Sequence, residues 1–199
     1  MHDDPRESTE MVTTYAADVG EWEAWQREYR FGVLLIYPPD PPLLQVNALR
    51  AEYDPRSQSV CDAHISLTIP LPRPLTEAHW IELESIASGI APITIHYGPL
   101  INYLPYPGVC LAIEPQAELD RLRAALETAS AFTGAPARRH PFSAHMTIAQ
   151  FISADETKAL MVELNEVAPQ GSFLCIGVSY AVPDSDFGFT ERMRLELSH

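Results

Sequence analysis

Hydrophobic and polar residues alternate along the chain with the period of strands in some segments and with that of helices in others. Residues 31–37 (FGVLLIY) are almost wholly apolar, and residues 63–69 (AHISLTI) are rich in β-branched side chains, so each indicates a strand. Thr76 is a good N-cap, and Leu75 can pack on Trp80 as a hydrophobic staple. The first half is therefore expected to contain strands at 31–37, 63–69 and 93–97 and helices at about 43–53 and 76–88.

The second half of the chain repeats this order of elements. Ser153 and Glu156 have the spacing of a capping box. His145 follows His64 by 81 residues, and the same offset places Ile93 inside the matching strand of the second half. This pattern predicts an internal structural repeat. We expect strands at 109–114, 143–151, 173–181 and 192–197 and helices at about 118–132 and 153–167.

The repeat predicts one bilobal domain behind an acidic N-terminal extension. Residues 1–20 are expected to be mobile, whereas Trp22, Trp25 and Tyr29 recur at helical spacing. We interpret this aromatic stripe as docking a short helix on the body rather than binding a ligand. The expected boundaries are 1–30 for the extension and 31–199 for the domain, with pseudo-symmetric lobes at about 31–98 and 109–197.

Charge restricts the partners of the protein. The chain has 199 residues, a formal net charge of −14 and a pI of about 4.8. An acidic surface repels long polyanions, because phosphate neutralisation drives nucleic-acid affinity. A small nucleotide or an RNA end needs only a few local positive groups. We therefore expect such a substrate and no long nucleic acid.

Other compositional features predict a cytoplasmic protein, which we also expect to be a monomer. Cys61, Cys110 and Cys175 lie in or beside apolar stretches, as buried thiols do in a reducing compartment. The polar N-terminus lacks the apolar region of a signal peptide, and no apolar run approaches the length of a membrane span. No Cys, His and carboxylate cluster has ligand spacing, so neither a metal nor a cofactor is expected.

Two short motifs carry the candidate chemistry: His64-Ile65-Ser66-Leu67 and His145-Met146-Thr147-Ile148. In a strand, residues i and i+2 point to the same face, so each motif presents an imidazole and a hydroxyl side by side. The apolar residues between them point into the core. If a pseudo-two-fold axis relates the halves, both pairs face one cleft.

This set of side chains suits phosphodiester cleavage. In-line displacement needs a base at the attacking oxygen and an acid at the leaving oxygen, and histidine supplies both forms near neutral pH. The hydroxyls can donate hydrogen bonds to the non-bridging oxygens. Two structural histidines are the competing interpretation, because a single H-x-[ST]-apolar match is common by chance. Both matches fall at equivalent places in the two halves, which favours the functional interpretation.

The paired motifs resemble those of the 2H phosphoesterase superfamily, which includes 2'-5' RNA ligases and cyclic phosphodiesterases. Residues 140–149 (HPFSAHMTIA) look like the second motif region of that family, and the resemblance covers about residues 31–197. It implies an α+β, bilobal fold with mostly antiparallel sheets around a central cleft. It also implies hydrolysis of 2',3'-cyclic phosphates or ADP-ribose cyclic phosphate, or reversible 2'-5' ligation. Its catalytic residues are then His64, Ser66, His145 and Thr147, with His145 as base and His64 as acid.

Four further residues are candidates for substrate binding. Arg139 precedes the second motif and can supply positive charge, while Tyr97, Tyr103 and Phe142 can stack on a base. The alternative for the arginine is a place in a solvated loop. The alternative for each aromatic residue is packing in the core or in a turn. A nucleotide-binding module that keeps the cleft without turnover is the main rival function, although both histidines and both hydroxyls are retained.

Overall fold

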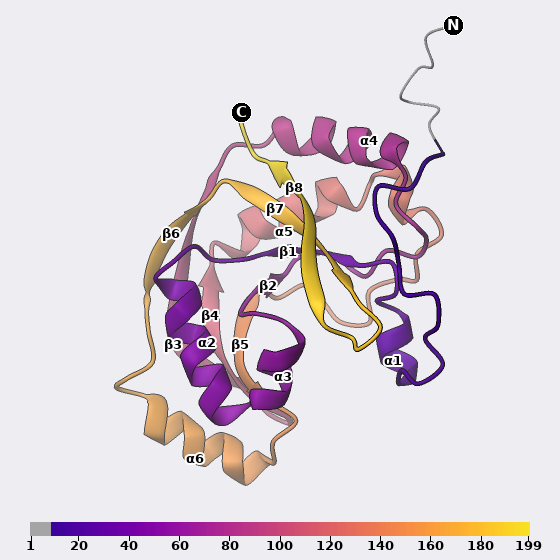
Figure 1. The fold of residues 1–199 in the computed structure, drawn as a ribbon. Helices are drawn as coiled ribbons and strands as arrows, with labels where there is room; N and C mark the ends of the chain where they lie inside the picture. Colours follow the sequence, from indigo (N-terminus) through magenta and orange to yellow (C-terminus); the bar gives the residue numbers. More distant parts are fainter. Residues whose placement is uncertain (1–8) are drawn as a thin grey trace, which may run out of the picture.

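The computed structural model describes residues 9–199, so residues 1–8 of the expected extension lie outside the described part. Eight strands form one antiparallel sheet in the order β6-β3-β4-β5-β2-β1-β7-β8, and six α-helices pack around it (Figure 1). The expected α+β class with an antiparallel sheet is confirmed.

Local signals place most of the helix starts. Thr76 accepts a hydrogen bond from the His79 amide at the start of α4, and Ser153 accepts one from the Glu156 amide at the start of α6. In chain order the elements are α1 (Ala24–Arg27), β1 (Val33–Ile36), α2 (Pro42–Tyr53), α3 (Pro55–Val60), β2 (Ile65–Ser66), α4 (Glu77–Ser88), β3 (Ile93–Tyr103), β4 (Tyr106–Glu114), α5 (Gln116–Leu126), the 3-10 helix η2 (Ser130–Phe132), β5 (His145–Gln150), α6 (Ala154–Leu164), β6 (Gly171–Cys175), β7 (Gly177–Pro183) and β8 (Phe189–Glu196).

Several elements differ from the expected ranges, and β3 continues to Tyr103, beyond the expected end at residue 97. The strand expected at 63–69 is only two residues long, because the amides of Leu67 and Thr68 both donate to the Leu34 carbonyl and end the ladder. The strand expected at 173–181 is divided into β6 and β7 at Ile176, and the helix expected at 118–132 ends at Leu126.

The two halves of the sheet are not the two halves of the sequence. The first repeat ends in β3, which pairs with β4 of the second repeat, and β7 of the second repeat pairs with β1 of the first. A strand from the end of each repeat thus pairs with the first strand of the other repeat, so that neither β4 nor β1 has a free edge. Strands of both repeats therefore alternate along one eight-stranded sheet, and the lobe boundaries at about 31–98 and 109–197 remain an expectation from the sequence.

The N-terminal segment docks on the domain from residue 9 onward. The Val12 amide donates to the Leu75 carbonyl at 3.1 Å, and the hydroxyls of Tyr15 and Tyr180 lie 3.0 Å apart. Trp22 is buried. Val12 and Tyr15 also pack against the core, so residues 9–20 contact the body, where the sequence suggested a mobile extension.

Candidate functional site

The two motifs meet as neighbouring strands at the centre of the sheet. Ile65 of β2 and Met146 of β5 are Cα partners in an antiparallel pair, and both side chains are fully buried. In this register each histidine stands opposite the hydroxyl residue of the other motif, so Ser66 faces His145 across the pair. All four polar side chains lie on the face opposite the two buried ones.

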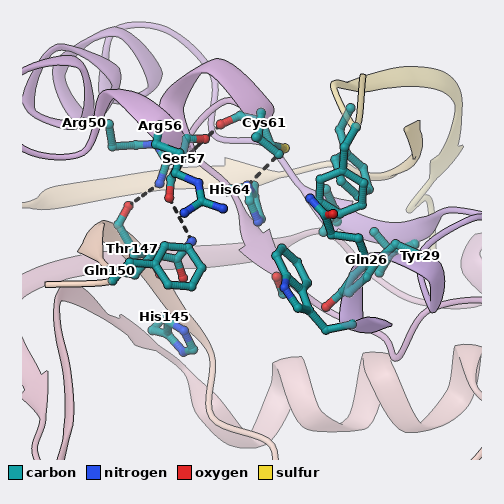
Figure 2. A pocket seen from close by; sticks show the side chains of 18 residues that line it. Gln26, Tyr29, Arg50, Arg56, Ser57, Cys61, His64, His145, Thr147 and Gln150 are labelled. Atoms are coloured by element: carbon teal, nitrogen blue, oxygen red, sulfur yellow. Dashed lines mark hydrogen bonds between the residues drawn. The ribbon is translucent and has the colours of Figure 1, made fainter. Parts of the chain in front are cut away.

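A cavity of about 440 Å³ lies over this face of the sheet (Figure 2). All four motif residues line it, as the alternation of the strands predicts. Val33 and Leu35 of β1 complete an apolar part of the floor, and α2 and α3 supply Arg50 and Arg56. The described lining contains no acidic side chain, although the net charge of the protein is −14, so the cavity favours an anionic ligand.

The imidazole rings of the two motifs are held in the same way. Nδ1 of His64 lies 2.7 Å from the Asp62 carbonyl oxygen, and Nδ1 of His145 lies 2.8 Å from the Ser143 carbonyl oxygen. A carbonyl only accepts hydrogen bonds, so Nδ1 carries the hydrogen in both rings. Nε2 is then the nitrogen that takes up or releases a proton in the cavity.

The environments of the two rings shift their pKa values in opposite directions. Burial lowers the pKa of His64, but the neighbouring Cys61 thiol and the Asp62 carbonyl outweigh burial, so its pKa is raised. Burial lowers the pKa of His145, and the hydrogen bond to Ser143 does not offset it, so its pKa is lowered. A pair of titratable groups separated in this way is suited to acid and base roles.

Arg50 of α2 fixes the backbone around both motifs. Its side chain is buried, and its guanidinium donates to the carbonyl oxygens of Thr147 at 2.8 Å and of Ser57 and Cys61 at 2.9 Å each. Loss of these bonds would remove a charged donor from three carbonyl groups around the motifs, although the Ser57 carbonyl would keep the Cys61 amide. The main role of Arg50 in the site is therefore to connect the end of α3 to β5 through these hydrogen bonds.

Aromatic side chains form one wall of the cavity. Trp25 of α1 lies with its ring centroid 5.3 Å from that of Phe187 and 6.5 Å from that of Phe151. Phe151 is 64% exposed, and the Arg56 guanidinium lies 5.4 Å from its ring centroid. Among the described residues, the two non-glycine residues with positive φ are Phe151 and Phe187, at 60° and 65°. Such backbone strain concentrates at functional sites.

Of the two tyrosines predicted to bind substrate, the structure brings only Tyr103 to the motifs. Its ring centroid lies 5.1 Å from that of His145, and its hydroxyl lies 3.3 Å from Ser143 Oγ. Tyr97 is buried and packs near Phe173 in the core, because its position in β3 points to the buried face. The proposed role of Tyr97 in stacking is therefore not supported.

Arg139 and Phe142 also lie outside the lining of the cavity. Arg139 forms an exposed ion pair with Glu28. Phe142 packs against the core and lies beneath the guanidinium groups of Arg123 and Arg138, at 5.6 Å and 5.4 Å. Both side chains have protein partners, and the structure places neither of them in the lining of the cavity.

Several lining residues were not predicted as site residues. Arg50 and Arg56 lie on polar segments without a motif, and Trp25 was interpreted as packing only. Cys61 was interpreted as a structural buried thiol, although it stands three residues before the first motif histidine. The sequence offered one signal that Cys61 belongs to the site, which is its position close to the first motif. No such signal exists for Arg50, Arg56 and Trp25, because their places in the cavity depend on contacts with distant segments.

Two kinds of feature are absent from the described part of the chain. Residues 9–199 contain no group of three or more His, Cys, Asp or Glu side chains placed to hold a metal ion. None of the described helices is long and apolar enough to cross a membrane.

An antiparallel α+β fold of this kind, with helices around a curled sheet, is that of the 2H phosphoesterases. The family model of the 2'-5' RNA ligase superfamily matches residues 38–186, and the chain belongs to this superfamily. Comparison with curated proteins finds no match.

Solved structures share the fold at low sequence identity. Escherichia coli LigT in complex with 3'-AMP matches with a TM-score of 0.58 and 17% identity over 84% of this chain and 97% of that one. The same protein in complex with NADP+ matches with a TM-score of 0.56 and 18% identity, over 84% and 96%. The protein TT0787 of Thermus thermophilus matches with a TM-score of 0.52 and 15% identity, over 83% and 96%.

Proposed function

We propose that the chain is a metal-independent phosphoesterase that hydrolyses a small cyclic or 2'-5' phosphodiester, of the 2',3'-cyclic nucleotide or ADP-ribose cyclic phosphate type. One observation carries this proposal: His64 and His145 line a single cavity on paired strands, each with Nδ1 bound to a carbonyl. They are diagonal neighbours in the ladder, a relation that separates two residues by about 7–8 Å. A phosphoryl group fits between them.

The reaction on a 2',3'-cyclic phosphate then runs as an in-line displacement. His145 Nε2 takes a proton from water while the water oxygen bonds to phosphorus. The bond from phosphorus to the 3'-oxygen breaks, and His64 Nε2 gives its proton to that oxygen, leaving a 2'-phosphate. Ser66 and Thr147 donate hydrogen bonds to the non-bridging oxygens, where negative charge is held in the transition state. Two imidazoles perform this chemistry without a Lewis acid.

The assignment of roles agrees with the electrostatics of the site. A general acid needs to be protonated and a general base neutral at the working pH. The raised pKa of His64 and the lowered pKa of His145 favour that combination over its reverse. Replacement of the leaving oxygen by an aryl oxide removes the need for an acid, so a 4-nitrophenyl phosphodiester substrate should restore turnover to His64→Ala and not to His145→Ala.

The cavity also has features that suit a nucleotide. Trp25 and Phe151 offer exposed ring faces, and Arg56 adds a positive charge beside them. Base stacking on aromatic side chains does not depend on sequence. The structural neighbour from Escherichia coli is described with 3'-AMP, NADP+ and ATP bound, which supports a nucleotide as ligand here.

Ligation is the second candidate, supported by the name of the superfamily. It uses the same groups, with an RNA 5'-hydroxyl in place of water as the nucleophile. The acidic surface favours hydrolysis of a small substrate over ligation of long RNA. A monomeric, cytoplasmic protein remains part of this proposal.

A substrate panel tests the proposal. Purified protein is incubated with 2',3'-cyclic nucleotides, ADP-ribose cyclic phosphate and 2'-5' linked oligonucleotides, with and without EDTA. We expect turnover of at least one small substrate, insensitive to EDTA and lost in His64→Ala and His145→Ala. Ligand-induced stabilisation without product would instead indicate a binding module, and a chelator-sensitive activity would contradict metal independence.

A further inference from the structure

The surroundings of the two motif histidines differ at the residue three positions before each histidine. The residue three before His64 is Cys61, whereas the residue three before His145 is Phe142. Cys61 Sγ lies 3.4 Å from Nδ1 of His64. Phe142 lies instead beneath the Arg123 guanidinium, at 5.6 Å, and does not line the cavity. Only one of the two otherwise equivalent imidazoles therefore has a sulfur beside its Nδ1 in the described part of the chain.

Cys61 is held firmly in this position. Its side chain is only 7% exposed, and Sγ also lies 3.4 Å from the Tyr37 hydroxyl. Its amide donates to the Ser57 carbonyl at the end of α3, and its carbonyl accepts from Arg50. Burial and the neighbouring sulfur raise the pKa of Tyr37, so the phenol keeps its hydrogen, and either its hydroxyl or the Cys61 thiol can donate the hydrogen bond between them. Tyr37, Cys61 and His64 thus form one hydrogen-bonded row.

We propose that Cys61 is a positioning residue for His64, which fixes the imidazole ring and stabilises its protonated form, and so makes His64 rather than His145 the acid of the reaction. This inference rests on the proposed function. Sulfur is polarisable and is a better partner for an imidazolium than for a neutral ring, most of all as a thiolate. No group of this kind contacts Nδ1 of His145 among the described residues.

The other groups around His64 do not explain the same asymmetry. The Asp62 carbonyl has a direct counterpart in Ser143 at the other ring. Arg50 of α2 disfavours a second positive charge, and His145 of β5 is itself a potential cation. In support of the proposal, burial raises the pKa of a thiol, yet His64, Tyr37 and Arg50 together lower the pKa of Cys61.

The experiment compares Cys61→Ser and Cys61→Ala with Cys175→Ser. Cys175 is an equally buried thiol, with its sulfur near the Gly177 carbonyl and outside the cavity, so it controls for loss of a buried thiol. The pKa of each histidine is measured by NMR titration of the unliganded protein. The pH profile of kcat/KM is measured on the best panel substrate, and thermal unfolding confirms the fold of each variant.

We expect the pKa of His64 to fall in both Cys61 variants, because the sulfur that raises it is removed. The basic limb of the pH profile should move to lower pH by the same amount, while its acidic limb and the Cys175→Ser profile stay unchanged. An unmoved His64 titration in the folded Cys61→Ser protein would overturn the inference. Absence of turnover on every substrate would instead contradict the proposed function. The titration distinguishes failure of the proposed function from failure of the inference on Cys61, because it needs no substrate.

Discussion

Ile65 is the direct Cα partner of Met146, and neither side chain is exposed to solvent. This pair sets the register that brings the two motifs together, because a slip of one residue would turn every motif side chain to the other face.

Truncation of this pair should destabilise the whole protein. We expect Ile65→Ala and Met146→Ala each to lower the free energy of unfolding by about 2–5 kcal/mol, the range for large-to-small changes at buried sites. Leu174→Ala, at a position that is 54% exposed on β6, is the control and should change stability little. Denaturant unfolding measures the differences. A loss below that of the control would show that the central pair is not closely packed.

The fold was largely predictable where the signal is local. The alternating and apolar runs identified β1 and β5, and the capping residues Thr76 and Ser153 identified the starts of α4 and α6. The division of 171–183 into two strands was not predictable, because it depends on which distant strands pair with each part. The pairing of β3 with β4 and of β7 with β1 was not predictable for the same reason, because it also depends on contacts between distant strands.

The site was predictable only as far as the motifs extend. Period-two alternation correctly placed His64 and His145 on one cavity. The candidate binding residues were chosen by residue type and by nearness to the motifs in the sequence. Tyr97 shows why this choice is insufficient, because the alternation of β3 points its side chain into the core. Trp25 comes from a segment 39 residues before the first motif, so its place in the wall depends entirely on tertiary packing.

The two histidines should act as one unit. Displacement needs the base and the acid together, so His64→Ala and His145→Ala should each cost nearly as much kcat as the double variant. Turnover of the three variants on the best panel substrate measures this, and His96→Ala, which changes a histidine of β3 outside the cavity, is the control. Near wild-type turnover in either single variant, or additive losses, would contradict the mechanism.

The motif hydroxyls should contribute less than the histidines. If each acts like a donor to a developing oxyanion, Ser66→Ala or Thr147→Ala raises the barrier by roughly 2.7–4 kcal/mol at most, about 10²–10³ in kcat. Ser66→Thr and Thr147→Ser keep the hydroxyl and are the matched controls. Equal losses in the alanine and hydroxyl-retaining variants would assign these positions to packing.

The pH dependence of the reaction should be bell-shaped around the ordinary histidine pKa of 6.5. Burial lowers the pKa of His145, so the base becomes neutral, and activity rises, below pH 6.5. The pKa of His64 is raised despite burial, so the acid stays protonated until above pH 6.5, where activity falls. The limbs of kcat/KM report these two groups in the free enzyme. A profile with a single limb would show that only one of them titrates in the reaction.

The aromatic wall should discriminate substrates by their base. Trp25 is 39% and Phe151 64% exposed, their ring centroids lie 6.5 Å apart, and both side chains line the cavity. Stacking of one base on an aromatic side chain contributes about 1–3 kcal/mol, or about 5–150-fold in affinity. We expect Trp25→Ala and Phe151→Ala to raise KM for a 2',3'-cyclic nucleotide by a factor in this range.

A substrate without a base isolates this contribution. Ribose 2',3'-cyclic phosphate should show the same KM in wild type and in both alanine variants, and Phe151→Tyr should behave as wild type because it keeps the ring. Tyr106→Ala removes a ring that is 69% exposed outside the cavity and controls for loss of a surface aromatic residue. Phe151→Gly relieves the left-handed backbone and also removes the ring, so it should match Phe151→Ala in KM if stacking is the cause. An equal rise in KM for the nucleotide and the base-free substrate would show that the wall shapes the catalytic face instead of binding the base.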